Sequence, residues 1–314
     1  MVAAAASWGF GTVASKLSLD RTHLRPLSQQ SIQLAASVVV LGVVAAMRGR
    51  RPSRVEWRHG RAGLLEPGAS YILSLIGLSM TAATHASIIG ALEPAFVTVA
   101  AWLFLRERVP AVTAVLMAVT LIGAALVVGG GADAHRSSTS GDLLLVASVV
   151  CAAAYVTMTI SSRASGSSAP LTLTFVQQVW ALGLVAPVLG ASMLVGGFGP
   201  LPQGPAWLLV VVSGLLSYLV PFALYLAALE SLPAALAAPY LALIPLCGLI
   251  GAAAVLHEPL TGQAGAGGTG ETVVIVALVV MSTRAECSPL SRRGEHSLAR
   301  GSISPARRPC ARSR

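Results

Sequence analysis

Long apolar runs are the feature that most limits what this chain can fold into. The sequence contains about ten separate runs of near 20 residues, and each could cross the ~30 Å hydrocarbon layer of a bilayer as a helix. A soluble domain of 314 residues could not hide so many runs. Hydrophobic residues make up 55% of the chain, charged residues only 11%, and the mean hydropathy is +0.76. Because lipid requires internally bonded backbone and barrel-type alternation is absent, we predict an all-α polytopic membrane protein.

We predict ten transmembrane helices, of which the last is weak. The boundaries in chain order are 2–19, 28–47, 62–80, 85–105, 111–131, 142–162, 171–195, 206–229, 234–256 and about 264–283. A basic loop at 48–61 joins the second and third spans, and a polar loop at 132–141 separates the two halves of the chain. Residues 284–314 are rich in Arg, Ser and Pro and lack apolar periodicity, so we predict a disordered basic tail.

One span occurs twice in the chain. Residues 86–109 form an apolar stretch with Pro94 inside it and Glu107 at its end. At an offset of 151 residues, Pro245 and Glu258 repeat this pattern, so the proline lies 13 residues before the glutamate in both copies. Such a long match between distant segments predicts an internal duplication.

The match extends to the first helix of each half. At an offset of 147, Trp8 and Thr12 fall on Tyr155 and Thr159, and these positions share one helix face. Five spans per half is an odd number, so the halves, residues 1–131 and 142–283, must be inverted relative to each other. Inverted repeats are the plan of secondary transporters, which hold substrate near the bilayer midplane where the halves meet.

The chain resembles the drug/metabolite transporter superfamily, specifically its EamA-type ten-helix members. The resemblance rests on the opening WGFGTVASKLSL, on LEPAFVTVAAWLFLRERV, and on its fainter copy LIPLCGLIGAAAVLHEPLTGQ. It covers about residues 8–280. The resemblance implies two inverted five-helix repeats and transport of small metabolites, often amino acids or related compounds.

The basic residues predict the orientation of the chain. With the N-terminus inside, Lys and Arg number 17 on the inside (six in 48–61, two beside Glu107, Arg163 and eight in the tail) and three on the outside. We therefore expect a multi-pass protein of the cell membrane with both termini cytoplasmic. The net charge of +9 then reflects topology and attraction to anionic lipids. Nucleic-acid binding is disfavoured because the charges lie on loops without a folded basic domain.

Glu93 is the sharpest candidate for a functional residue. A carboxylate near a helix centre costs roughly 2.5–3.5 kcal/mol on insertion scales, so it should face a cavity or a partner. It could carry a proton; alternatively, it is neutral and bonded to carbonyls freed beside Pro94. Ile244 occupies the matching position of the second copy. Pro94 and Pro245 should kink their helices and either line a transport site or serve packing alone.

Aromatic and amide side chains complete the candidate substrate or coupling site. The aromatic residues could line a cavity or form interfacial belts, and they are Trp8, Tyr71, Tyr155, Tyr225 and Tyr240. Thr12 and Thr159 share helix faces with two of them. Gln177 shares a face with Thr174, Gln178 and Ala181 that we expect to point inward, toward substrate or toward another helix.

Three further features have simpler expected roles. We expect Glu66 to lie near the inner end of its helix and reach water. Lys16 should reach the outer surface, the alternative being contact with substrate or a carboxylate. The small-residue stripe predicts a close-packing seam, and its members are Ser7, Gly11, Ala14 and Ser18.

The motifs of most enzymes are missing. The sequence has no G-x-x-x-x-G-K-[ST] phosphate loop, its four cysteines lack metal-ligand spacing, and no nucleophile–base pair stands out. We therefore predict no enzyme, no cofactor and no metal. The expected partners are a small-molecule substrate, protons as a candidate coupling ion, and membrane lipids. We predict secondary-active transport by alternating access, with amino-acid-type efflux the leading interpretation; a membrane scaffold, sensor or lipid-scrambling protein is the alternative. The oligomeric state stays open.

Overall fold

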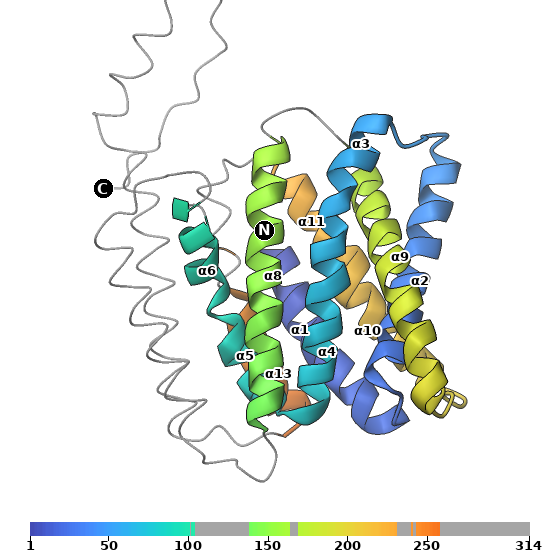
Figure 1. The fold of residues 1–314 in the computed structure, drawn as a ribbon, viewed down its shortest axis with the longest axis vertical. Helices are drawn as coiled ribbons and strands as arrows, with labels where there is room; N and C mark the ends of the chain where they lie inside the picture. Colours follow the sequence, from blue (N-terminus) through green and yellow to red (C-terminus); the bar gives the residue numbers. More distant parts are fainter. Residues whose placement is uncertain (101, 104–137, 164–168, 231–239, 241–242, 258–314) are drawn as a thin grey trace, which may run out of the picture.

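The structure is a computed structural model that describes residues 1–100, 102–103, 138–163, 169–230, 240 and 243–257 (Figure 1). Within these residues every regular element is helical, as the sequence predicts. The fifth and last predicted spans, the tail, Glu107 and Glu258 lie outside them.

The described helices follow the predicted spans, with several breaks. Their bounds are α1 (Val2–Thr22), α2 (Pro26–Met47), α3 (Arg54–His59), η1 (Gly60–Leu64), η2 (Leu65–Ala69), α4 (Ser70–Met80), α5 (Ala83–Gly90), α6 (Glu93–Ala100), α8 (Thr139–Arg163), α9 (Pro170–Gly196), α10 (Ala206–Gly214), η4 (Leu215–Leu219), α11 (Val220–Ala228) and α13 (Leu243–Val255). In the described part, five stretches are long and apolar enough to cross a membrane, namely Pro26–Met47, Arg54–Met80, Thr139–Thr159, Pro170–Leu194 and Ala206–Ala228.

The outer surfaces of these helices are apolar. Val39 on α2 is 63% exposed, Leu194 on α9 is 90% exposed, and Leu208 on α10 is 67% exposed. The polar side chains instead gather inside, where Gln29, Gln30, Gln33, Gln177 and Gln178 are fully buried or nearly so. Apolar outside and polar inside is the distribution that a lipid solvent favours.

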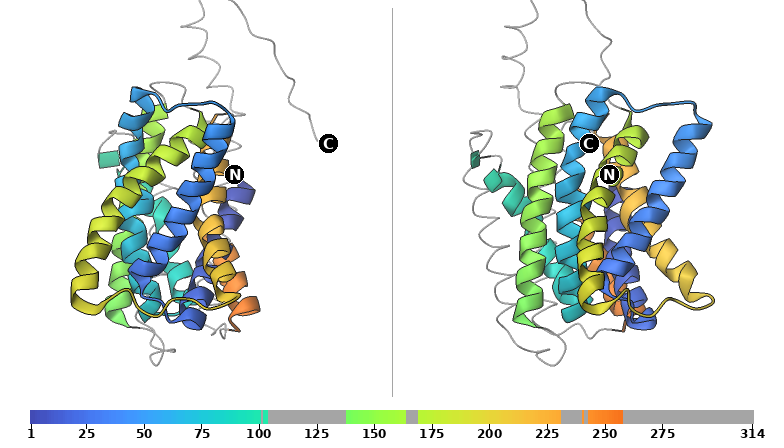
Figure 2. Two further views of the ribbon diagram at one scale, coloured as in Figure 1. Left: turned by 90° about the vertical axis from the view of Figure 1, so that its right-hand side faces the viewer. Right: turned by 45° about the vertical axis from the view of Figure 1, so that its right-hand side comes forward.

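The described spans of the two halves run in opposite directions (Figures 1 and 2). The Ser28 hydroxyl at the start of α2 donates to the Phe198 carbonyl after α9 over 2.6 Å. The Ser138 amide before α8 donates to the Met80 carbonyl at the end of α4 over 3.2 Å. Both junctions lie at the lower end of Figure 1, where α1 ends and α8 begins. Each described span of the first half is therefore antiparallel to its sequence match in the second half.

The third span of each half departs from a regular α-helix at a matched position. The kinked segment η2 (Leu65–Ala69), where two helices meet, and the π-helical turn η4 (Leu215–Leu219) are 150 residues apart, close to the offset of the repeat. In η2 the backbone is non-helical at Glu66 (φ −143°, ψ 127°), because a following proline disfavours the helical conformation. The Gln30 amide donates to the freed carbonyls of Pro67 and Gly68, at 3.3 Å each. Such π-turns often occur at functional sites.

Helix α1 lies between the halves and packs closely on both. A Cβ atom on Gly11 would lie 2.7 Å from the Ser217 hydroxyl, and one on Gly9 would lie 2.5 Å from the Ile244 carbonyl. The Ser7 hydroxyl donates to the Leu216 carbonyl over 2.8 Å. The predicted close-packing seam is thus confirmed at Ser7 and Gly11. Because about half of its residues are buried against other helices, α1 can be less apolar than the five stretches above.

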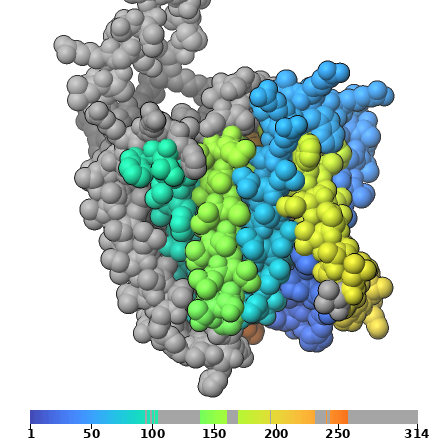
Figure 3. All heavy atoms as spheres, in the orientation of Figure 1, coloured from blue at the N-terminus to red at the C-terminus, as the bar shows by residue number. Residues whose placement is uncertain are grey.

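The inward face of α9 is also confirmed. Thr174, Gln177, Gln178 and Ala181 are all buried. Gln178 joins three helices, because it accepts from the Ser37 hydroxyl over 2.5 Å and donates to the Tyr218 carbonyl over 2.7 Å. On the face shown in Figure 3, α8 lies against α4 along its length, and α4 separates α8 from α9.

Three details of the predicted span boundaries are wrong. The basic loop contains helix α3, because Ser53 and Glu56 form a capping box in which each side chain accepts from the other's backbone amide. The fourth span is not continuous: α5 ends at Gly90 and α6 begins at Glu93. Pro94 therefore lies in the first turn of α6, where its missing amide donor is tolerated. Residues 139–141, predicted as loop, belong to α8.

Candidate functional site

A cavity of about 130 Å³ lies between the two halves, large enough for several waters or part of a small solute. Its lining comes from α1, η2, α4, α5, α6, α8, η4, α11 and α13, with Gln33 added from α2. Apart from α2, these elements belong to the first, third, fourth, sixth, eighth and ninth predicted spans. Both irregular third spans contribute, through Glu66 in η2 and Ser217 in η4.

Seven of the eleven candidate residues line this cavity, and they are Trp8, Thr12, Tyr71, Glu93, Tyr155, Tyr225 and Pro245. Gln177 lies behind the lining, where its Oε1 accepts from the Tyr155 hydroxyl over 3.2 Å. Thr159 is buried outside the lining, and Tyr240 is partly buried away from it. The side chain of Pro94 lies outside the described part of the chain.

Aromatic rings from both halves meet beside the cavity. Phe222 packs against Trp8 at 5.1 Å between ring centroids and against Tyr155 at 5.8 Å. Trp8 also contacts Tyr225 at 5.6 Å. Edge and tilted contacts at these distances are the favoured arrangements of aromatic pairs. The fold thus gathers the sequence-matched pair Trp8 and Tyr155 around one ring.

A hydrogen-bond chain links the first half to the π-helical turn η4 of the second half. The Trp8 indole donates to the Tyr71 hydroxyl over 2.9 Å. That hydroxyl donates to the backbone carbonyl of Ser217 over 2.9 Å. Since Ser217 lies within η4, Tyr71 satisfies an acceptor at this turn and fixes the rim of the cavity.

Glu66 is the main lining residue that sequence reasoning missed. It is 9% exposed and lies in the break of η2, so the expectation that it reaches water at a helix end is wrong. The helix begins at Arg54 rather than near residue 62, which places Glu66 deep in the span. A usable signal was present: the tripeptide Leu-Glu-Pro occurs at Leu65–Pro67 and again at Leu92–Pro94.

Glu93 begins α6 and faces the same cavity. A carboxylate in the first turn of a helix is favoured by the helix dipole and the free amides there. Glu66 and Glu93 both line this cavity. Within the described residues, neither has a salt bridge or hydrogen bond to another side chain.

The described charges near the lower end of Figure 1 are held outside the cavity. The Lys16 ammonium donates to the Leu78 carbonyl over 3.1 Å and lies 3.4 Å from the Asp20 carboxylate. Its side chain is only 14% exposed, so Lys16 makes the carboxylate contact that we gave as the alternative. His85 Nδ1 lies 3.6 Å from Asp142 Oδ1, which also accepts from the Thr81 hydroxyl over 2.9 Å.

Antiparallel halves around a partly polar cavity, with irregular helices facing it and apolar outer surfaces, are the features of a polytopic membrane protein. A family model described as the EamA-like transporter family matches residues 1–129 and 139–283. The chain belongs to this family, and it is therefore a membrane transporter of the drug/metabolite transporter type.

The fold has a counterpart among solved structures. The chain is similar to one described as "Crystal structure of protein", with 18% sequence identity and a TM-score of 0.64. The match covers 91% of this chain and 97% of the other. At this identity the likeness concerns the fold alone. A search of curated proteins found no match.

Proposed function

We propose that the protein is a secondary-active transporter that moves a small metabolite by alternating access through the cavity between its halves. The observation that carries the proposal is the cavity itself, which is lined by sequence-matched positions of two antiparallel sets of helices, Trp8 with Tyr155 and Glu93 with Ile244. Pairs of this kind let one site face either side of the membrane, since the two halves can exchange conformations around it.

The full architecture belongs to the same proposal. It consists of ten transmembrane helices in two inverted five-helix repeats, residues 1–131 and 142–283, in the cell membrane with both termini cytoplasmic. Support comes from the opposite directions of the described spans and from the two-part family match. We expect the two halves to move relative to each other along helix α1, because Gly9 and Gly11 bring its backbone against α13 and η4.

The cargo class follows from the family, whose members carry small metabolites, and amino-acid-type efflux is the leading candidate. Glu93 is the proposed coupling residue, because it is a carboxylate that faces the cavity from a broken helix. Proton binding at this position would link the pH gradient to the direction that the cavity faces.

Counterflow in proteoliposomes tests the proposal. Vesicles containing the purified protein are loaded with one member of a metabolite panel, and entry of the labelled compound is followed. We expect saturable accumulation that protein-free vesicles lack. A folded, reconstituted protein that exchanges no member of a broad panel of amino acids, amines, sugars and nucleosides would favour the scaffold interpretation.

A further inference from the structure

The hydrogen-bond donors around the cavity are largely engaged by the protein. Trp8 donates to Tyr71, Tyr71 donates to a carbonyl of η4, and Tyr155 donates to Gln177. Three further hydroxyls donate to carbonyls one turn back in their own helices, and they belong to Thr12, Ser87 and Ser148. The hydroxyls of Ser15 and Ser217 share a hydrogen bond over 3.3 Å. Among the described lining residues, Ser70 and Ser74 keep hydroxyls without such a bond, so a substrate that needs more donors than these two would have to break the bonds above.

The hydrogen-bond acceptors of the cavity, in contrast, are largely without a donor within the described part of the chain. Glu66 and Glu93 line the cavity without a salt bridge or hydrogen bond to another described side chain. Gln33 is fully buried and lines the same cavity. Its amide nitrogen donates to the hydroxyls of Ser213 and Ser15, whereas its Oε1 has no partner among the described residues. Buried acceptors without donors are costly, so a ligand that brings donors would be favoured.

The charges favour the same kind of ligand. No described residue of the lining is Lys, Arg or His. The nearby Lys16 is held by Asp20 and the Leu78 carbonyl, and His85 is held beside Asp142. An anion would therefore meet two carboxylates and no described counter-charge within the lining.

The rings of the lining suit a cation as well. Trp8, Tyr71, Tyr155 and Tyr225 all face the cavity. Aromatic faces attract ammonium and guanidinium groups, most strongly in sites shielded from water. The two carboxylates and the faces of the four aromatic rings are all negative toward a ligand, so the site favours a cation.

We infer that the cavity takes a cationic substrate with N–H donors, such as a primary ammonium or a guanidinium, and holds it between Glu66 and Glu93. This inference rests on the proposed transport function and specifies its substrate class. Gln33 Oε1 would accept a further N–H, and the aromatic rings would cover the carbon skeleton.

Equilibrium binding to the purified full-length protein in detergent tests the inference. The probes are benzylamine, benzyl alcohol and benzoate, which share one ring and differ in the charge of the attached group. We expect benzylamine to bind and benzoate and benzyl alcohol to bind at least tenfold more weakly. Benzyltrimethylammonium keeps the charge without N–H donors and should bind more weakly than benzylamine.

Variants assign the site to the two carboxylates. We expect Glu66→Gln and Glu93→Gln each to weaken benzylamine binding by roughly ten- to a hundredfold, the range for a hydrogen bond to a charged group. Glu56→Gln is the matched control, because Glu56 is also buried but lies in the capping box of α3, outside the cavity. It should leave the affinity unchanged. Equal melting temperatures would show that the variants are folded.

The outcomes separate the inference from the transport proposal. Benzoate or benzyl alcohol binding as tightly as benzylamine overturns the cation site, as does absence of benzylamine binding or unchanged affinity in both cavity variants. Counterflow of an anionic or neutral metabolite without amine binding would leave transport standing and overturn the cation site. Amine binding that is lost in the glutamine variants, without any counterflow, would support the site and count against transport.

Discussion

Two neighbouring tyrosines show how much a single hydroxyl can contribute at this interface. The rings of Tyr71 and Tyr218 lie 4.6 Å apart. The Tyr71 hydroxyl accepts from Trp8 and donates to the Ser217 carbonyl. The Tyr218 hydroxyl is buried without a hydrogen-bond partner in the described part of the chain. The two side chains are chemically identical, but within the described residues only the Tyr71 hydroxyl forms hydrogen bonds that link the two halves.

Tyr71→Phe should be clearly destabilising. It leaves the Trp8 indole and the Ser217 carbonyl without their partner, and an unsatisfied buried polar group costs about 1–3 kcal/mol. The free energy of unfolding, measured by denaturant titration in detergent micelles, should fall by an amount in this range. Tyr218→Phe is the control and should change it little, because no described bond is lost. Equal losses in the two variants would contradict the hydrogen-bond chain.

The pH dependence of transport should depend on both cavity carboxylates. Since Glu66 and Glu93 both line the cavity, a proton on either one changes the charge that the substrate meets. Glu93→Gln and Glu66→Gln should each flatten the pH profile of counterflow, and the double variant should abolish the dependence. Glu56→Gln should keep the wild-type profile. A double variant with an unchanged profile would remove both residues from coupling.

At the scale of elements, the sequence predicted the helices better than the breaks within them. The lengths of the apolar runs were enough to predict a helical membrane protein, and the matched prolines were enough to predict the repeat. Glu66 was misplaced because the start of its helix depends on the capping box of Ser53 and Glu56, within a segment that looked like a basic loop. The π-turn at η4 is followed directly by Pro221 in the first turn of α11. Because proline lacks the amide that would bond the Ser217 carbonyl four residues earlier, the sequence held a signal for this irregularity that the span prediction did not use.

The close approach of η1 to α9 can be tested by adding a side-chain atom at Gly63. A Cβ atom on Gly63 would lie 1.9 Å from the backbone carbonyl oxygen of Gln177. Gly63→Ala must therefore push the two elements apart, and overpacking of this kind costs about 1–3 kcal/mol. The melting temperature in detergent should fall clearly.

Gly183→Ala provides the matched control on α9 itself. Nothing lies within 4 Å of a Cβ atom at this position, and alanine favours helix by up to about 1 kcal/mol over glycine. The melting temperature should stay the same or rise. If both alanine variants melted alike, the close approach of η1 to α9 would be refuted.

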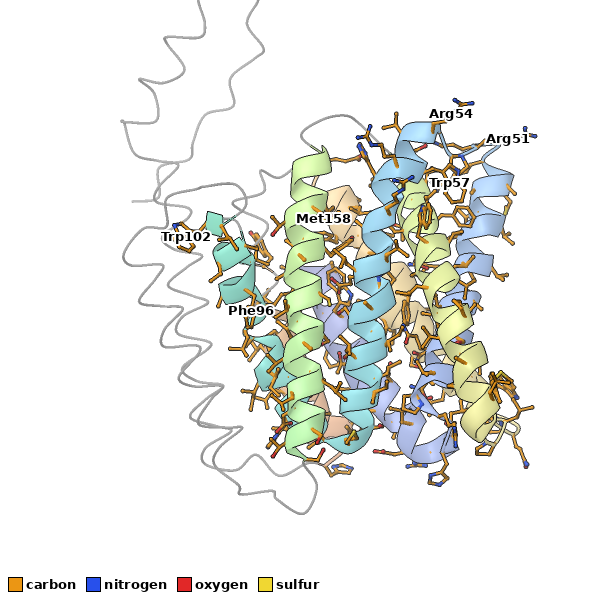
Figure 4. The ribbon with its side chains drawn as sticks, in the orientation of Figure 1. Arg51, Arg54, Trp57, Phe96, Trp102 and Met158 are labelled. Carbon is orange, nitrogen blue, oxygen red and sulfur yellow. The ribbon has the colours of Figure 1, made fainter. Side chains whose placement is uncertain are left out.

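At the scale of the whole molecule, the two ends differ in charge and in their aromatic residues. Arg51, Arg54 and Trp57 lie together at the upper end in Figure 4. Arg61 lies over the Trp180 ring, 5.7 Å from its centroid, and Trp180 donates to the Trp57 carbonyl over 3.0 Å. Tryptophan and arginine at one level are typical of a membrane interface facing anionic lipid. The opposite end has fewer basic residues in the described part of the chain, with Arg21 and Arg25 exposed there, and its Lys16 and His85 lie beside Asp20 and Asp142; its exposed tryptophan is Trp207.

This asymmetry predicts which end faces the cytoplasm, and single cysteines can test it. Arg51 and Gln203 are both exposed. Arg51 follows α2, whereas Gln203 precedes α10 beside the start of α2, so they lie at opposite ends. In a background with the native cysteines replaced, Gln203→Cys should react with a membrane-impermeant maleimide in intact cells, and Arg51→Cys only after permeabilisation. The reverse pattern would invert the orientation. Labelling of both sites from outside would mean that the two ends do not lie on opposite sides of the membrane, which the antiparallel halves require.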